Sequence, residues 1–498
     1  MVTPAVGRRY KQHYPYHLSS IHVASTQGSP TLAAAPETTP RSAWIALGVV
    51  LAGSYAVTLN TTVIGVALPT MAADLGSGAG LDIDWVVTGF LLGVVTILPA
   101  TGWMADRWGR STVYRWGLWA FAACTIGCVL APSVDSLVAV RFAQGLAGGI
   151  LIPVGMTIIY EIFPPHRRGL AMGIWGVGIA AAPAAGPPLG GWLITTAGWR
   201  WLFVVMLVLA AIAAIAAAVL LPASTERRPR PLDAIGWALA SVAVLTGVFV
   251  AREAGSLGLF SAPVVLLSSL SIASFLAFVR RSRDRLDALI DLQMFRHRGF
   301  LVVLAVTAPL SVTQYARLNF LPVELQVVRD LTAADAGVIL APGAFGVAVA
   351  MPIAGWLVDR TGPRLPAVVG LGIVTVTMIG LGTLDADVPE WSIAAILVVQ
   401  GVGTALAYVP TTVGAMSSVA PEQAAAASAM QNLDRQLMGA LGVALLSAVL
   451  VSRVGAVTPS DAGPGAAQNA YNLVFLVAAA VAAVGTVVAA RLPRSTEP

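Results

Sequence analysis

The stretch GWMADRWGR, residues 102–110, decides the fold, because it places charged side chains between two long apolar runs and then occurs a second time. The second copy, GWLVDRTGPR, covers residues 355–364 and begins 253 positions after the first. Both copies contain a glycine, a tryptophan, an aspartate, an arginine and a second glycine at matching positions. A repeat at this separation indicates that one half of the chain is a duplicate of the other half.

The amino-acid composition distinguishes a membrane protein from a water-soluble one. Of its residues 57% are hydrophobic and 11% are charged, and the mean hydropathy is +0.81. A water-soluble domain carries about 25% charged residues, so a soluble fold could not cover this much apolar surface. Helices in a bilayer need no such cover, because lipid surrounds them and each helix satisfies its own backbone hydrogen bonds. The sequence therefore predicts an all-α membrane protein.

Apolar segments of about 20 residues, long enough to cross about 30 Å of hydrocarbon, follow one another from residue 43 almost to the end of the chain. Fourteen spans are predicted, near 43–69, 84–104, 112–131, 135–159, 169–195, 199–221, 233–251, 260–279, 299–321, 334–357, 365–384, 391–414, 425–451 and 469–490.

The distribution of basic residues orients these spans. With the N-terminus in the cytoplasm, 22 of the 29 lysines and arginines fall on the cytoplasmic side of the membrane and four on the outer side. Cytoplasmic loops of membrane proteins carry such an excess of positive charge. We therefore expect a multi-pass protein of the plasma membrane with both termini in the cytoplasm, and the preference for arginine over lysine suggests a bacterial source.

The position of the second copy predicts the domain organisation. It follows the tenth span rather than the eighth, so two extra spans separate two bundles of six, in a 6+2+6 arrangement. We expect pseudo-twofold-related bundles around a central cavity. The expected parts are a disordered cytoplasmic tail (1–41), an N-terminal bundle (42–221), two extra helices with a cytoplasmic linker (222–298), a C-terminal bundle (299–490) and a cytoplasmic tail (491–498).

The predicted linker carries apolar residues at helical spacing among arginines. These residues are Leu286, Leu289, Ile290 and Met294. The pattern favours an amphipathic helix that lies on the inner leaflet of the membrane, with a solvated connection as the alternative.

The repeated phrase predicts a conformational latch. A glycine at a helix end allows two backbones to approach closely, and the aspartate can face the start of a neighbouring helix, where negative charge is favoured. Such charge-assisted contacts contribute about 1.5–3 kcal/mol each. They must break when the cytoplasmic side, where both copies are predicted to lie, opens. The predicted latch residues are Gly102, Asp106, Arg107, Gly109 and Arg110 in the first copy and Gly355, Asp359, Arg360 and Gly362 in the second.

The repeated phrase resembles the inner-loop signature of the major facilitator superfamily, and the 6+2+6 arrangement is similar to its fourteen-helix drug:proton antiporter branch. The resemblance covers about residues 43–490. It includes the stretches LNTTVIGVALP (59–69), RFAQGLAGG (141–149) and RQLMGALGVALL (435–446). It implies a major facilitator fold and, for Arg141, an association with proton coupling.

The stretch GIAAAPAAGPPLGGW (178–192) resembles the antiporter motif of that branch, which marks exporters rather than importers. Prolines lack an N–H group and bend a helix, while glycines four residues apart allow close helix packing. The predicted motif residues are Gly186, Pro187, Pro188, Gly190 and Gly191. An ordinary membrane kink is the alternative.

The chain departs from the family pattern at Asn60, where the first-helix motif normally carries an aspartate that takes part in proton or cation recognition. Since asparagine carries no proton at working pH, another group must titrate if protons drive transport. Ionisable groups within a bilayer are costly and are commonly functional. Asp434, the carboxylate placed deepest in a predicted span, is the first candidate for proton coupling, and Arg141 and Glu324 are further candidates.

The predicted spans contain three arginines and one deep aspartate, which favours anionic, zwitterionic or neutral substrates over lipophilic cations. The candidate cavity residues are Asn60, Thr61, Gln144, Gln314, Tyr315, Arg317, Asn319, Gln431 and Arg435. For the uncharged members of this set, structural hydrogen bonds between helices are an equally good explanation.

The sequence as a whole predicts a secondary active transporter that exports small organic molecules, drugs and antibiotics among them, by proton antiport with alternating access. The expected partners are the substrate, protons and the lipid bilayer. We expect a monomer without enzymatic activity, nucleic acid, metal or cofactor. Asn60 leaves open an uncoupled facilitator or a proton-linked importer of a metabolite, and a membrane-bound sensor is a remote alternative.

Overall fold

The chain forms a set of long helices. The computed structural model describes residues 41–76, 83, 85–222, 231–257, 261–283, 292–385, 387–454 and 464–493. Within these residues there are fourteen α-helices, one for each predicted span. They are α1 (Arg41–Leu75), α2 (Trp85–Trp108), α3 (Arg110–Leu130), α4 (Val134–Ile162), α5 (Arg168–Ala197), α6 (Arg200–Leu220), α7 (Ala234–Leu257), α8 (Ala262–Arg283), α9 (Arg298–Val327), α10 (Ala333–Thr361), α11 (Arg364–Gly382), α12 (Glu390–Ser417), α13 (Ala424–Val454) and α14 (Pro464–Ala489).

Most of these helices are suited to a membrane. Twelve of them have, among the described residues, an apolar window long enough to cross a bilayer, and the other two are α5 and α7. Most of the apolar window of α4 is buried against other helices, whereas less than half of that of α9 is buried. The predicted N-terminal tail lies outside the described residues except for Arg41, which begins α1.

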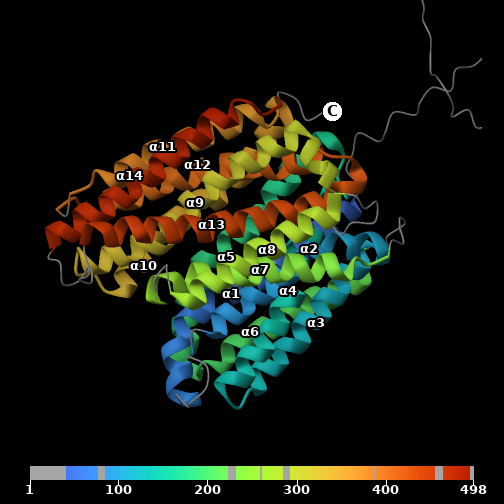
Figure 1. The fold of residues 1–498 in the computed structure, drawn as a ribbon, viewed down its shortest axis with the longest axis horizontal. Helices are drawn as coiled ribbons and strands as arrows, with labels where there is room; N and C mark the ends of the chain where they lie inside the picture. Colours follow the sequence, from blue (N-terminus) through green and yellow to red (C-terminus); the bar gives the residue numbers. More distant parts are fainter. Residues whose placement is uncertain are drawn as a thin grey trace, which may run out of the picture. The chain divides into compact units, whose positions relative to one another are not determined.

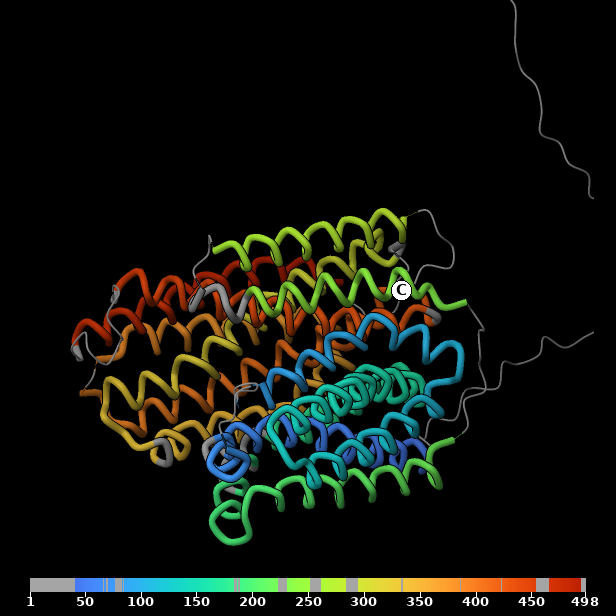
Figure 2. The backbone as a smooth tube through the Cα atoms, turned by 60° about the horizontal axis from the view of Figure 1, so that its bottom comes forward, coloured from blue at the N-terminus to red at the C-terminus, as the bar shows by residue number. Residues whose placement is uncertain are grey.

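The helices contact one another in two groups of six. In the first group the pairs α2–α4, α1–α5 and α3–α4 pack extensively, and in the second group the pairs α10–α12, α11–α14 and α11–α12 do so. Figure 2 shows α1–α6, coloured blue to green, together in its lower part and α9–α14, coloured yellow to red, together in its upper part. The predicted pair of extra helices, α7 and α8, lies between the groups in the chain.

Backbone contacts between α2 and α4 depend on two glycines. A Cβ added to Gly93 would lie 2.1 Å from the carbonyl oxygen of Phe142, and one added to Gly145 would lie 2.0 Å from the carbonyl oxygen of Phe90. No side chain fits at either position, so the two helices touch through their backbones.

The same pair of contacts recurs between α10 and α12. A Cβ added to Gly346 would lie 2.4 Å from the carbonyl oxygen of Val398, and one added to Gly401 would lie 2.3 Å from the carbonyl oxygen of Gly343. The α10 residues stand 253 positions after their α2 counterparts, as in the repeated phrase, and the α12 residues stand 256 positions after their α4 counterparts. The duplication predicted from a nine-residue phrase is therefore present in the packing of the helices.

The α7–α8 pair contacts both groups. α7 packs against α8, α2 and α13, and Figure 1 shows α7 and α8 beside each other and next to α13. The indole N–H of Trp237 and the hydroxyl of Ser241 donate to the carbonyl oxygen of Thr96 at 2.9 and 3.2 Å. Thr96 lies three residues before Pro99, next to Val95, whose carbonyl loses its helical donor because proline has no N–H. The two bonds from α7 therefore attach to α2 beside the proline.

An ion pair joins α7 and α8 at the same end of the pair, where α7 begins and α8 ends. Arg281 Nε donates to Asp233 Oδ1 at 2.8 Å, and the Asp233 side chain is almost fully buried. The same carboxylate oxygen accepts the Gly236 backbone N–H at 3.0 Å, near the start of α7. Asp233 therefore holds α8 against α7 and also stabilises the first turn of α7.

The structure describes only part of the linker for which an amphipathic helix is predicted. Leu286, Leu289 and Ile290 lie outside the described residues. The described part, Leu292–Arg296, is a 3-10 helix in which Met294 is fully buried in a cluster with Phe300. The prediction that Met294 faces the membrane surface is wrong, because this methionine packs into the second group of helices.

Candidate functional site

The two groups of helices meet where α10 ends and α5 begins. The backbone N–H groups of Gly169 and Leu170 donate to Oδ1 and Oδ2 of Asp359 at 2.7 and 2.8 Å. The first N–H groups of a helix have no partner within the helix and carry partial positive charge. Both are satisfied here by one carboxylate from the other group. The contact is the one that the repeated phrase predicts for its aspartate.

Glycines bring α5 and α10 into backbone contact at the same place. A Cβ on Gly169 would lie 2.3 Å from the carbonyl oxygen of Gly355, and a Cβ on Gly355 would lie 2.1 Å from that of Gly169. One turn further along α5, a Cβ on Gly173 would lie 2.3 Å from the carbonyl oxygen of Met351. The glycine of the second copy of the phrase is therefore required for the two helices to touch.

The first copy of the phrase takes part in an equivalent contact. A Cβ on Gly102 of α2 would lie 3.1 Å from Cα of Ala426, near the start of α13. Farther along α13, the hydroxyl of Ser428 donates to the carbonyl oxygen of Pro153 in α4 at 3.0 Å. We call the end of the bundle where α2 and α10 end and α5 and α13 begin the repeat face, and the opposite end the far face.

Contacts between the two groups join α5 to α10 and α12, and join α2 and α4 to α13. The glycine contacts at Gly102, Gly169 and Gly355 lie at the repeat face. Beyond Gly176 the glycines of α5 face α1 instead of α10: Gly178 packs on Leu51, and Gly186 packs on Thr62. The described residues thus close the boundary between the two groups at the repeat face. We call the α5–α10 part of this boundary, with Gly169, Gly355 and Asp359, the seam.

The remaining latch residues have partners within their own group or a backbone role. Arg110 forms an ion pair with Glu161 of α4, and the Arg360 guanidinium stacks 4.3 Å from the Trp356 ring centre. Arg107 lies 5.8 Å from the Trp103 ring centre.

The second glycine of each copy ends its helix. Gly109 has φ 86° and Gly362 has φ 76°, a backbone conformation that glycine adopts without strain. The common role of these two glycines is to turn the chain into the next helix.

Arg141 of α4 lies at the centre of a buried polar network in the first group. Its Nη1 donates to Gln144 Oε1 at 2.7 Å and to Asn60 Oδ1 at 3.1 Å, and its Nε donates to the Val86 carbonyl oxygen at 3.1 Å. The guanidinium also lies 4.5 Å from the Phe90 ring centre, at cation–π distance. In the part of the chain described here, Arg141 has no carboxylate partner.

The side chains that contact Arg141 are neutral, and they also contact further neutral side chains. Gln144 Nε2 donates to Thr125 Oγ1 at 2.7 Å, and the thiol of Cys128 lies 3.8 Å from Gln144 Oε1. Asn60 is fully buried, and its Nδ2 has no hydrogen-bond partner among the described residues. Among the described residues, this network contains no carboxylate and no histidine.

A second polar cluster lies on α12 and α13 of the other group. Arg435 Nη2 donates to Thr412 Oγ1 at 2.7 Å, and its guanidinium stacks 3.8 Å from the Tyr408 ring centre. The preceding residue, Asp434, is half-buried, and its Oδ2 has no hydrogen-bond partner in the described structure. Because Arg435 is held by α12, the two charges do not form an ion pair.

The Asp434 cluster lies deep within the helices. Asp434 is ten residues from the start of α13, about 15 Å along the helix axis. Gln431, one turn earlier, is fully buried and donates weakly to Thr307 Oγ1 at 3.5 Å. Tyr315 of α9 packs against α13 one turn later, where a Cβ on Gly439 would lie 2.5 Å from its ring.

Glu324 belongs to the far face instead. It lies in the last turn of α9 and pairs with Arg329 rather than with Arg317, at 3.8 Å, with both side chains about 5% exposed. The Arg329 guanidinium also donates to the carbonyl oxygens of Val388 and Asp385 at 2.7 and 3.0 Å. These bonds fasten the α9–α10 connection to the α11–α12 connection.

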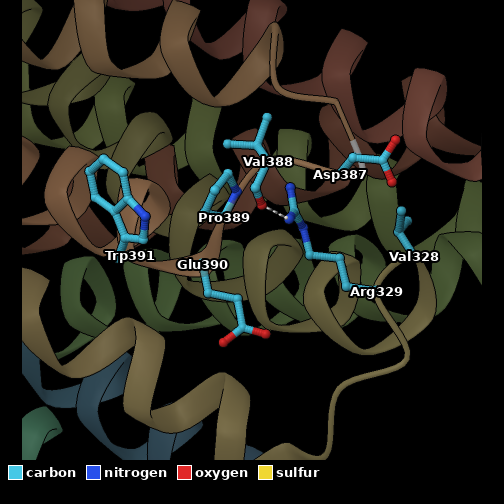
Figure 3. Close-up of a pocket in the computed structure, with 7 residues that line it drawn as sticks. All are labelled: Val328, Arg329, Asp387, Val388, Pro389, Glu390 and Trp391. Atoms are coloured by element: carbon cyan, nitrogen blue, oxygen red, sulfur yellow. Dashed lines mark hydrogen bonds between the residues drawn. The ribbon is translucent and has the colours of Figure 1, made fainter.

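A pocket of about 710 Å³ opens beside Arg329. It is lined by Val328, Arg329, Asp387, Val388, Pro389, Glu390 and Trp391, and Figure 3 shows the Arg329 side chain directed at the carbonyl of Val388. The pocket is made by connections and helix ends of the second group. It therefore lies at the far face, apart from the closed seam.

The predicted antiporter motif packs against the predicted first-helix motif. A Cβ on Gly186 of α5 would lie 2.6 Å from Thr62 Oγ1, and this hydroxyl donates to the Ala182 carbonyl oxygen at 3.4 Å. Gly190 is buried, whereas a Cβ on Gly191 would meet open space.

The two prolines of this motif do not end α5, which continues from Arg168 to Ala197. The side chains of Pro187 and Pro188 lie outside the described part of the structure.

The other candidate cavity residues are dispersed. The Thr61 hydroxyl and the Asn319 amide both donate to carbonyls of their own helices, so local hydrogen bonding accounts for these two. Gln314 is half-buried. Sequence reasoning missed Thr125, which accepts from Gln144, and also missed Tyr408 and Thr412, which contact Arg435. No spacing along one helix reveals these contacts.

The chain is similar to known membrane transport proteins. A family model described as Major Facilitator Superfamily matches residues 50–443. A relative from Mycobacterium tuberculosis, named multidrug resistance protein B homolog, is 30% identical over 486 residues, covering 90% of this chain and 89% of the relative. The tetracenomycin C resistance and export protein of Streptomyces glaucescens is 30% identical over 417 residues, covering 84% and 77%.

Two solved structures have the same fold at low sequence identity. The human organic anion transporter MFSD10 superposes with a TM-score of 0.59 at 18% identity, covering 89% of this chain and all of that chain. The proton:xylose symporter XylE superposes with a TM-score of 0.62 at 14% identity, covering 92% and 98%.

Proposed function

The chain belongs to the major facilitator superfamily, and from this membership we propose that it exports small organic molecules, drugs and antibiotics among them, by antiport with protons. Its relatives named for multidrug resistance and for tetracenomycin C export support export as the direction of transport. The antiporter motif on α5, packed on α1 through Gly186, agrees with that direction. The protein acts as a carrier in a bacterial plasma membrane.

The observation that carries the mechanism is the seam closed by Asp359. We place the repeat face in the cytoplasm, because most of the basic residues then lie inside. In the observed state the two groups are joined on that side, which closes the path between α5 and α10 from the cytoplasm. Opening of this contact in turn with closure at the far face would give alternating access.

The contacts between α5 and α10 are weak enough to break and re-form during transport. Its helices meet through glycine backbones, and the polar contact is two charge-assisted hydrogen bonds to one carboxylate, worth about 1.5–3 kcal/mol each. A contact of this size favours one state without making it permanent. Since Asp359 accepts from free N–H groups at a helix start, water can replace both donors when the seam opens.

Proton coupling is assigned to Asp434. Its Oδ2 lacks a donor in the observed state, and its neighbour Arg435 is occupied by Thr412 and Tyr408. A proton on Asp434 removes the cost of an unpaired charge, so protonation favours the state in which this group is least solvated. Coupling requires only that the proton affinity differ between the two states.

The two other coupling candidates are less suited to this role. Arg141 faces the neutral amide of Asn60, and Glu324 is held by Arg329 at the far face. Asn60 does favour one second function, an uncoupled facilitator, because the described residues of the buried network around Arg141 include no carboxylate.

Inside-out membrane vesicles distinguish these functions. An acidic lumen reproduces the natural gradient, and fluorescein and rhodamine 6G serve as an anionic and a cationic probe. A proton-coupled exporter accumulates a probe in the vesicle above its outside concentration, and a protonophore abolishes the accumulation. Equilibration to equal concentrations with or without the gradient would establish the facilitator and overturn antiport.

A further inference from the structure

We propose that Arg317 and Gln400 form an anion-binding subsite in the second group of helices, at the place that corresponds to the Arg141 network in the first group. The subsite would take an organic molecule with an acidic oxygen, a carboxylate or phenolate, near a hydroxyl donor. This inference rests on the proposed export function and specifies the class of molecule that is exported.

The glycine contacts identify which residues correspond. Because α10 repeats α2 at an interval of 253 and α12 repeats α4 at an interval of 256, Gly343 corresponds to Phe90. In the same way Leu397 corresponds to Arg141, and Gln400 corresponds to Gln144. The second group therefore keeps the buried glutamine, but it has lost both the arginine and the aromatic ring under it.

An arginine from another helix fills the vacated place. A Cβ on Gly343 would lie 3.6 Å from Nη1 of Arg317 and 3.2 Å from Cβ of Leu397. The guanidinium of α9 therefore lies beside the residues that correspond to Phe90 and Arg141. A phenylalanine at position 343 would occupy the space that Arg317 uses.

The three helices present these residues at one depth. Arg317 is ten residues before the end of α9, Gly343 is ten residues after the start of α10, and Gln400 is ten residues after the start of α12. Each is about 15 Å from the far-face end of its helix. Two of the three helices, α10 and α12, also contact α5 of the first group.

The two arginines differ in how they are satisfied. Arg141 has three acceptors, whereas Arg317 makes no hydrogen bond or ion pair with the described residues. Gln400 is 2% exposed, and its Oε1 has no donor. An unpaired guanidinium within a membrane is costly unless something binds it. An acidic oxygen satisfies Arg317 through charge-assisted hydrogen bonds, and a hydroxyl on the same molecule satisfies Gln400.

The test uses full-length protein in proteoliposomes with an imposed pH gradient and two probes that share a xanthene ring, fluorescein as the anion and rhodamine 6G as the cation. Arg317→Gln is expected to raise the KM for fluorescein about tenfold or more, the effect of one lost charge-assisted hydrogen bond, and to leave that for rhodamine 6G unchanged. Arg200→Gln, the same change at an exposed site on α6, is the control and should alter neither.

A relocation variant separates a binding role from a packing role. Arg317→Leu combined with Leu397→Arg places the guanidinium on α12, as Arg141 is placed on α4. Recovery of fluorescein transport to within about threefold of the wild-type KM is expected. Equal losses for both probes in Arg317→Gln, or an unchanged KM for fluorescein, would overturn the subsite.

Failure of the export function gives a different result. If wild-type protein moves neither probe, fluorescein binding to the purified protein is measured by fluorescence polarisation. Weaker binding to Arg317→Gln than to wild type then supports the subsite without export. Equal binding, or no binding to the wild type, overturns the subsite.

Discussion

Asp359 and Gly169 join the two halves of the molecule: Asp359 Oδ1, on α10, accepts a hydrogen bond of 2.7 Å from the backbone N–H of Gly169, at the start of α5. The aspartate comes from the second copy of the repeated phrase, and the N–H group comes from a helix start of the first half. A single carboxylate thus bridges two bundles across 190 positions in the chain.

Asp359→Asn should weaken the closed seam. The amide can accept one of the two hydrogen bonds without charge, so a loss of about 1.5–3 kcal/mol shifts the population toward an open repeat face. In a variant without Cys124 and Cys128, a cysteine placed at Met351 should react about tenfold faster with a membrane-impermeant maleimide applied from the cytoplasmic side.

Asp335→Asn is the matched control for this experiment, because it makes the same change in the first turn of α10, at the far face. Unchanged labelling in Asp359→Asn would mean that the glycine contacts alone keep the seam closed.

Gly355→Ala should prevent the seam from closing. The new Cβ would lie 2.1 Å from the carbonyl oxygen of Gly169, and a backbone cannot yield as a flexible side chain does. We expect normal amounts of protein in the membrane but transport reduced at least tenfold, since closure is part of each cycle. Gly337→Ala on the same helix meets nothing within 4 Å and should transport normally; equal activities would show that α5 and α10 can separate at no cost.

Asp434→Asn should uncouple transport from protons. The amide cannot change its charge, so gradient-driven accumulation in inside-out vesicles should fall to equilibration, while exchange of labelled for unlabelled substrate continues. Glu390→Gln removes a carboxylate at the start of α12 and should keep full accumulation. If Asp434→Asn still accumulates substrate, coupling resides elsewhere, and Glu324→Gln becomes the next variant to test.

Asp74 should give the protein an acid-sensitive contact at the far face. Hydrogen bonds from Trp199 and Arg200 lower the pKa of Asp74 below its ordinary 3.8. A carboxylate with a lowered folded-state pKa stabilises the fold above its unfolded pKa and loses that contribution as the pH falls through the folded value. The melting temperature of the wild type should therefore drop below about pH 4 in a way that Asp74→Asn does not; parallel curves for the two proteins would contradict this.

The sequence supplied most of the fold because membrane helices are encoded locally. Apolar segment length placed all fourteen described α-helices, and the repeated phrase led to the correspondence between α2 and α10 that the glycine contacts confirm. The aspartate of the phrase could be assigned to a helix start, since helix dipoles and unpaired N–H groups are general properties.

The candidate site was less accessible to prediction, because its contacts join helices that are distant in the chain. Arg110 pairs with Glu161, 51 positions away, and Arg435 is held by α12 rather than by its neighbour Asp434. Gln400 could have been found by extending the duplication from Gln144, but the position of Arg317 depends on the absence of a side chain at Gly343. The burial of Met294 likewise follows from packing that an amphipathic pattern does not specify.

The α7–α8 pair covers one of the two junctions between the groups, α2–α13, and not the other, α5–α10. Trp237 and Ser241 attach it to α2, and α7 also contacts α13, so it shields the α2–α13 junction from lipid. Among the helix contacts of the described chain, no such pair shields the α5–α10 junction. Two junctions that are related by duplication therefore differ in their surroundings, since α7 covers one of them and the described helices leave the other without such a cover.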